Sequence, residues 1–96
     1  MRIISRKKLQ DFWLKHPQSR PSLESWYRIV KRSTFMAFSE LRSTFPGADT
    51  VGKLTVFNIG GNKYRLVAAV HYRGGRVYVR KILSHSEYDK GKWKED

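Results

Sequence analysis

The segment Ser84-His85-Ser86-Glu87-Tyr88 carries the residues of this chain best suited to proton transfer. His85 and Tyr88 are three positions apart, and on a helical turn such residues project from nearly the same side. At a helix N-terminus the dipole favours a neutral imidazole, which can accept a proton, while the Tyr88 hydroxyl can donate or accept one. The segment also fits a capping box between Ser84 and Glu87. That simpler role requires neither His85 nor Tyr88.

These residue types suit the cleavage of RNA without a metal ion. In that reaction a base takes the proton of the attacking 2′-OH, an acid protonates the leaving 5′-oxygen, and cations stabilise the phosphorane. Lys63, Arg65 and Arg80 are candidates for the phosphate-binding cations. The other basic residues that we assign to RNA binding, all within or just after the same β-rich segment, are Arg73, Arg76, Lys81 and Lys90.

Two further motifs have less specific interpretations. His71 is an alternative catalytic histidine, but a histidine at a strand end is commonly structural. Gly60-Gly61-Asn62 fits a tight hairpin turn better than a phosphate cradle, because glycine adopts the positive φ that such turns require. The sequence contains no carboxylate cluster with metal-ligand spacing, no Walker loop and no dinucleotide glycine motif, so we expect neither a metal nor another cofactor.

Charge is the strongest global feature of the sequence. The 96 residues include 20 Lys and Arg against 8 Asp and Glu, which gives a formal net charge of +12. Such an excess attracts polyanions, so nucleic acid or an acidic protein is the expected partner. The length predicts one domain over residues 1–96. No apolar run reaches the ~20 residues of a membrane span, and there are no cysteines, so we expect a cytoplasmic protein without a membrane partner.

Hydrophobic periodicity predicts two helices near the N-terminus. After Arg6, Leu9, Phe12 and Trp13 recur at i, i+3 and i+4, and Pro17 ends the run. The second helix should begin within residues 19–22, with Pro21 in its first turn and Glu24 placed to complement its dipole. Its apolar stripe, at i, i+3, i+4 and i+7, consists of Leu23, Trp26, Tyr27 and Val30.

The region 33–53 gives a weaker pattern. Its aromatic and leucine residues suggest a short third helix, capped by Ser39 or Thr34 and stopped by Pro46-Gly47. Residues 48–53 are predicted to form a loop. The charged tail 91–96 should fray unless the indole of Trp93 docks on the body.

Three apolar runs of β type follow, at Leu54–Ile59, Tyr64–Val70 and Val77–Leu83, and residues 1–5 form another short strand candidate. Tight glycine turns make consecutive strands antiparallel. The predicted fold is therefore α+β, with the two N-terminal helices on one face of a small, mainly antiparallel sheet, and a helical turn at 84–90.

Two helices cover one face only, so the second face of the sheet should be partly open. Strict alternation places Arg65 on one face with Val67 and Ala69, and Arg80 on one face with Tyr78 and Ile82. A sheet face that mixes basic and aromatic side chains suits RNA, whose phosphates bind guanidinium groups and whose bases stack on rings.

The motifs resemble those of a known family. The blocks Phe57-Asn58-Ile59-Gly60-Gly61-Asn62, Tyr64-Arg65-Leu66-Val67 and Ser84-His85-x-Glu87-Tyr88-Asp89, in this order, resemble the HigB branch of the RelE-like toxins of bacterial toxin–antitoxin systems. The resemblance extends over most of the chain. Members of this branch usually have Thr-His where this chain has Ser84-His85, and serine caps a helix equally well.

The resemblance implies a RelE-like microbial ribonuclease fold and an mRNA interferase that cleaves translated messages at the ribosome. It also implies inhibition by a cognate antitoxin, expected to be a helix-turn-helix DNA-binding protein. Carried onto this chain, Arg65 becomes the phosphate stabiliser, and His85 and Tyr88 become the acid/base candidates. Two alternatives use the same basic face: a non-catalytic module that binds RNA or the ribosome, and a toxin with a protein target.

Overall fold

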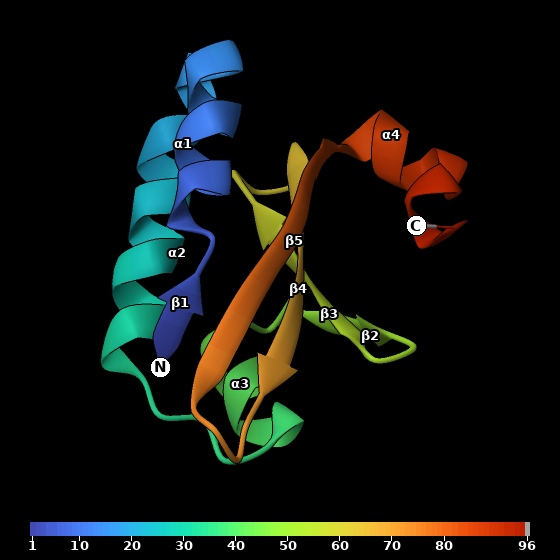
Figure 1. The fold of residues 1–96 in the computed structure, drawn as a ribbon. Coiled ribbons are helices and arrows are strands. Elements are labelled where there is room, and N and C mark those ends of the chain that lie inside the picture. Colours follow the sequence, from blue (N-terminus) through green and yellow to red (C-terminus); the bar gives the residue numbers. More distant parts are fainter. Residues whose placement is uncertain (96) are drawn as a thin grey trace.

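The computed structural model describes residues 1–95, which form a layer of helices on one face of a five-stranded sheet (Figure 1). The N-terminal elements are β1 (Arg2–Ile4), α1 (Arg6–Lys15), η1 (Pro17–Ser19), α2 (Arg20–Arg32) and α3 (Phe38–Thr44). The remaining elements are β2 (Asp49–Val51), β3 (Leu54–Ile59), β4 (Tyr64–His71), β5 (Arg76–Ser84), α4 (His85–Lys90) and η2 (Lys92–Glu95). The predicted α+β class is confirmed.

The strand order is β1-β5-β4-β3-β2. Pairing is antiparallel between β2 and β3, β3 and β4, and β4 and β5, whereas β1 lies parallel to β5. The prediction of a mainly antiparallel sheet is therefore confirmed. The predicted loop at 48–53 is wrong, because Asp49–Val51 pairs with the start of β3 as β2. Its three residues are too few for an alternating pattern to be visible in the sequence.

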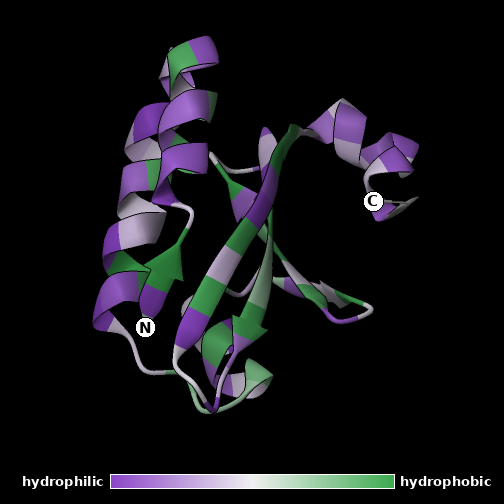
Figure 2. Cartoon of the chain, in the orientation of Figure 1, coloured by the Kyte–Doolittle hydropathy of each residue, from purple (hydrophilic) through white to green (hydrophobic). Residues whose placement is uncertain are grey.

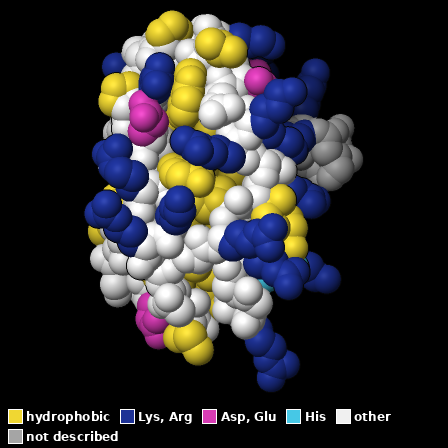
Figure 3. All heavy atoms as spheres, turned by 60° about the vertical axis from the view of Figure 1, so that its left-hand side comes forward, with side chains coloured by type: hydrophobic (Ala, Val, Ile, Leu, Met, Phe, Trp, Pro, Cys, Tyr) yellow, Lys and Arg dark blue, Asp and Glu magenta, His cyan; other side chains and the backbone are white. Residues whose placement is uncertain are grey.

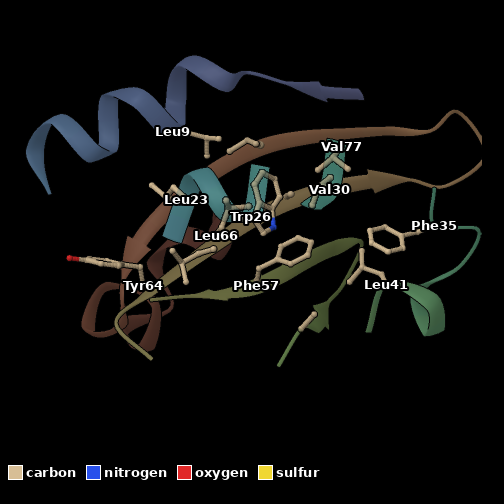
Figure 4. Packing of buried hydrophobic residues seen from close by; sticks show 14 residues of the cluster. Leu9, Leu23, Trp26, Val30, Phe35, Leu41, Phe57, Tyr64, Leu66 and Val77 are labelled. Carbon is tan, nitrogen blue, oxygen red and sulfur yellow. The ribbon is translucent and has the colours of Figure 1, made fainter. Parts of the chain in front are cut away.

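The main core lies between the helices and the sheet. Leu9 of α1 and Leu23, Trp26 and Val30 of α2 are buried at the predicted helical spacing. The Trp26 ring meets the edge of Phe57 from β3, with ring centroids 5.4 Å apart. Figure 4 shows these side chains converging on the space between the two layers, while Figure 2 shows mostly hydrophilic residues along the rest of α1 and α2. The apolar stripes thus fix which sides of the helices face the sheet.

The start of α2 at Arg20 lies within the predicted range 19–22, but the predicted role of Glu24 and the predicted caps of α3 differ from the structure. Because α2 begins at Arg20, Glu24 lies beyond the first turn and instead forms an exposed ion pair with Arg20 at 2.8 Å. At α3, neither predicted cap is used. The N-cap residue is Ala37, and the Glu40 carboxylate accepts a hydrogen bond from the Met36 N–H at 3.0 Å.

The second face of the sheet, predicted to be partly open, is covered in part by the C-terminal segment. Trp93 of η2 is only 6% exposed and packs against Val56 of β3 and Val67 of β4. Leu83 and Tyr88 border the same cluster. The C-terminal segment folds back over this face, so the indole docks and the tail is held against the body.

A register shift interrupts the β4–β5 ladder. Val67 pairs with Lys81 and Ala68 pairs with Val79, which leaves Arg80 as an extra residue in β5. Because of this β-bulge, the side chains of β5 after Arg80 point to the opposite faces of the sheet from those that strict alternation predicts.

The predicted grouping of Arg80 with Tyr78 and Ile82 is therefore wrong. Ile82 packs against the core on the helix side, and Leu83 packs against the cluster on the opposite face. On β4 successive side chains alternate between the two faces of the sheet as predicted. Val67 packs in the cluster with Trp93 and Val56, whereas Leu66 and Ala68 pack in the main core. Arg65 is thus on the face that the sequence predicted.

Candidate active site

The capping box predicted at the start of α4 is present. The Ser84 hydroxyl accepts a hydrogen bond from the Glu87 N–H at 3.2 Å, and the Glu87 carboxylate accepts one from the Ser84 N–H at 3.0 Å. The hydrogen bond from the Ser84 backbone N–H to the Glu87 carboxylate, and secondly the Ser84 side chain, lower the pKa of Glu87. The box places His85 at the first helical position and Tyr88 one turn later, directly after the end of β5.

The β3–β4 turn brings Asn62 against His85. Gly60 and Gly61 both have positive φ, 63° and 70°, so the predicted hairpin turn is confirmed. The His85 N–H donates to the Lys63 carbonyl at 3.0 Å, and His85 Nδ1 lies 3.2 Å from the Asn62 carbonyl oxygen. These contacts fasten the first residue of α4 to the turn.

Asn62 also holds Arg65. The Arg65 guanidinium donates to the Asn62 side-chain oxygen at 2.6 Å and to the Asn62 carbonyl at 3.3 Å. The same carbonyl therefore faces both Arg65 and His85. Sequence reasoning treated Asn62 only as a turn residue; the signal for a further role was its position two residues before a strand that starts with Tyr64-Arg65.

Tyr88 joins the group through its ring. The Arg65 guanidinium carbon lies 5.6 Å from the centre of the Tyr88 ring, within the range of a cation–π contact. On its other side the ring stacks on Trp93 at 5.1 Å, and the indole N–H donates to the Tyr88 carbonyl at 3.0 Å. The sequence analysis assigned Trp93 no part in the site. Here it supports the side chain of a proposed catalytic residue.

The His85 ring has a second acceptor. Its Nε2 lies 2.8 Å from a carboxylate oxygen of Asp89, one turn along α4. A ring that donates from both nitrogens satisfies Asp89 and the Asn62 carbonyl together, whereas a neutral ring donates to one of them. The sequence analysis considered only the helix N-terminus around His85, which favours a neutral ring. The 42% exposed His85 side chain and the 61% exposed Asp89 side chain leave this pair accessible from solvent.

The predicted RNA-binding residues separate into two groups. Lys81 and Lys90 line a hollow of about 400 Å³ together with Trp93, beside α4. Arg76 pairs with His71, at the opposite end of the β4–β5 hairpin from Arg65. His71 and Arg65 are six residues apart along β4, or roughly 20 Å of strand.

Arg73 lies in the turn at that far end. There, Arg76 donates to the Tyr78 hydroxyl at 3.3 Å, and the rings of His71 and Tyr78 meet edge to face at 5.0 Å. Arg73, Arg76 and the alternative histidine are therefore distant from the Arg65–His85–Tyr88 group. Lys63 lies in the β3–β4 turn next to Asn62, whereas Arg80 lies midway along β5, at the bulge.

Comparison with known proteins gives a consistent match. Residues 19–91 match the family described as HigB toxin, RelE-like toxic component of a toxin–antitoxin system, and this span includes Arg65, His85 and Tyr88. Among similar proteins, mRNA interferase HigB of Escherichia coli O6:H1 is 34% identical over 93 residues, covering 94% of this chain and 90% of the relative. The mRNA interferase toxin HigB of Escherichia coli K12 is 34% identical over 92 residues, covering 93% and 88%. In the described residues 1–95, no helix is long and apolar enough to cross a membrane.

Proposed function

The chain belongs to the HigB family of RelE-like toxic components of toxin–antitoxin systems, and we propose from that premise that it is an mRNA endoribonuclease which works without a metal ion. The observation that carries this proposal is the meeting of Arg65 and His85 at the Asn62 carbonyl, with the Tyr88 ring beside the guanidinium. A cation and two proton-transfer groups, all partly accessible to solvent, thus lie together at one end of the paired strands β4 and β5.

The reaction follows from the roles that these groups can take. The 2′-oxygen attacks the adjacent phosphorus while His85 or Tyr88 removes its proton, and the other residue protonates the departing 5′-oxygen. The products are a 2′,3′-cyclic phosphate and a 5′-hydroxyl end. Arg65 stabilises the additional negative charge on the phosphorane, because its guanidinium is held in place by Asn62 before the substrate binds.

The family also defines the regulatory setting. As a toxic component of a toxin–antitoxin system, the chain has a cognate antitoxin. We propose that this antitoxin is a helix-turn-helix DNA-binding protein, and that the toxin acts in the cytoplasm on translated mRNA at the ribosome. The net charge of +12 supports binding to ribosome-associated RNA.

The test compares wild type with Arg65→Ala and His85→Ala after induced expression, using growth arrest and primer extension on a translated message. Loss of a positioned acid or base lowers the cleavage rate by about 10²–10⁴-fold. Arg76→Ala is the matched control, because it removes the same charge at the far end of the same hairpin. It should retain cleavage within a few-fold of wild type.

Three outcomes would contradict the proposal. Full cleavage by both site variants would exclude this site. Cleavage by purified protein that stops on addition of EDTA would exclude the mechanism without a metal. Growth arrest by wild type with no new mRNA 5′ ends would replace the nuclease by a binding module or a toxin with a protein target.

A further inference from the structure

Three adjoining hollows run across β5 and meet at Lys81. One, of about 310 Å³, lies between α1 and β5, where Lys15 and Phe12 face Lys81 and Leu83. A second, of about 190 Å³, connects Lys8 and Lys81 with Trp93. The third, of about 400 Å³, continues from Lys81 and Trp93 to α4 and η2. All three are lined by Lys81, and we refer to them together as the β5 trough.

Positive charge dominates the walls of the β5 trough. Its basic residues come from four elements and are Lys8, Lys15, Arg80, Lys81, Lys90 and Lys92. The lining carboxylates are Asp11 and Glu87, and Glu87 already accepts the hydrogen bond of the α4 capping box. Figure 3, which brings the helix side forward, likewise shows Lys and Arg side chains far more often than Asp and Glu. The trough therefore attracts an anionic chain rather than a neutral one.

The β-bulge connects α1 to this trough. At Arg80 the bulge leaves a backbone carbonyl of β5 to which the Lys8 ammonium donates a hydrogen bond at 3.0 Å. An ammonium has three N–H donors, and this bond uses one. The bond holds the head group of Lys8 over the trough, and Lys15 stands about two turns, or roughly 10 Å, further along α1. Two lysines spaced in this way can contact successive phosphates of one strand.

The shape of the trough favours a single strand of RNA over an acidic protein segment. The hollow between α1 and β5 is lined by the apolar side chains of Phe12 and Leu83 as well as by lysines, so bases can contact the apolar side chains while phosphates face the lysines. The trough lies next to the proposed catalytic group, because Trp93, which lines two of the hollows, stacks on Tyr88. A strand in the trough would thus pass beside the residues that cut it.

We propose that the β5 trough binds the RNA strand on one side of the cleaved phosphate, with Lys8 and Lys15 of α1 as phosphate contacts. This proposal rests on the proposed nuclease function and extends it, because it assigns a substrate-binding role to α1, which contributes none of the proposed catalytic residues. The cleavage site and the α1 contacts are two parts of one path, which makes RNA length a determinant of affinity.

The test measures binding of a fluorescein-labelled, fully 2′-O-methylated 12-nucleotide RNA by anisotropy over a range of salt concentrations. This RNA has no 2′-OH to attack, so binding is measured whether or not the protein is a nuclease. Lys15→Gln should weaken binding several-fold and reduce the slope of log K against log salt by about 0.7, the value for one phosphate contact on a single strand. Asp11→Asn removes the competing carboxylate of the same hollow and should strengthen binding.

Lys7→Gln is the matched control, since it makes the same charge change on the same helix and Lys7 is not among the described residues that line the trough. Equal effects of Lys7→Gln and Lys15→Gln would show that only overall charge matters and would overturn the proposal. An Asp11→Asn variant that binds the RNA with wild-type affinity would also overturn the proposal.

RNA length provides a second, independent measurement. In one series the RNA is shortened stepwise from its 5′ end, and in the other from its 3′ end. In one of the two series, the difference in affinity between wild type and Lys15→Gln should disappear at the length at which the RNA no longer reaches α1. A difference that persists at every length in both series would overturn the proposal. If the variants change RNA binding as expected but the wild-type protein cleaves no unmodified RNA, the proposed nuclease function is wrong, whereas the assignment of the trough as an RNA-binding site is supported.

Discussion

Replacing Trp93 by alanine should both destabilise the protein and disorganise the catalytic group. The indole is 6% exposed, packs against Val56 and Val67, stacks on Tyr88, and donates a hydrogen bond to the Tyr88 carbonyl. Truncating a buried tryptophan to alanine costs about 3–5 kcal/mol. Because Trp93 belongs to the small cluster on the second face and not to the main core, its segment can detach while the sheet stays folded, so we expect a loss of about 3 kcal/mol.

This loss is measured by urea unfolding followed by far-UV circular dichroism, alongside RNA cleavage by the same preparations. Trp93→Phe keeps an aromatic ring on Tyr88 but removes the N–H donor, so it should cost about 1 kcal/mol and preserve most of the cleavage activity. Trp93→Ala should lose cleavage even at temperatures where it is fully folded, because the Tyr88 ring loses one of its two supports. Wild-type stability together with wild-type cleavage in Trp93→Ala would refute the conclusion that η2 positions Tyr88.

Three further predictions concern the elements around the site. Ser84→Ala removes the side-chain half of the capping box and should cost about 1 kcal/mol in urea unfolding; an unchanged midpoint would show that the box does not stabilise α4. Hydrogen bonds from Ser84 lower the pKa of Glu87 in the folded protein below its ordinary value of 4.5. The Glu87 carboxylate therefore contributes its full stabilisation at pH values above 4.5, and this stabilisation is lost as the pH falls through the pKa of the folded state. Thermal melts in acid should show this loss in wild type but not in Glu87→Gln, and parallel curves would contradict it. Gly61→Ala, at φ +70°, should cost about 1–2 kcal/mol by strain alone, since nothing lies within 4 Å of the added Cβ; it should also reduce cleavage, by displacing Asn62, and wild-type activity would argue against that displacement.

Local signals in the sequence determined much of the architecture. The capping box of Ser84 and Glu87, the positive φ of Gly60 and Gly61, and the helical spacing of Leu23 and its successors all appear where they were predicted. Each depends on residues within about one or two turns of each other, so the sequence contains all the information needed. The same is true of the α+β class, which follows from the order of helical and strand periods.

The sequence also determined which residues could do chemistry, but not which of them meet. Arg65 was assigned to the catalytic group and Arg76 only to RNA binding, but the sequence alone does not show which of the two lies near His85. Pairing of β4 with β5 then placed Arg65 and His85 at one end and Arg76 at the other. Strand register, which depends on the whole hydrophobic surface of the sheet, therefore selected the members of the site.

Tertiary structure alone decided the features that involve distant parts of the chain. The bulge at Arg80, the docking of Trp93 on the second face, and the shared contact of Arg65 and His85 with Asn62 each join residues whose proximity no local pattern encodes. The parallel placement of β1 beside β5 is of the same kind, with about seventy residues between the two strands. Local preferences fix turns and helices because their energies act between neighbours in the chain. The geometry of the proposed active site and the β5 trough depend on side chains that become neighbours only when the core has packed.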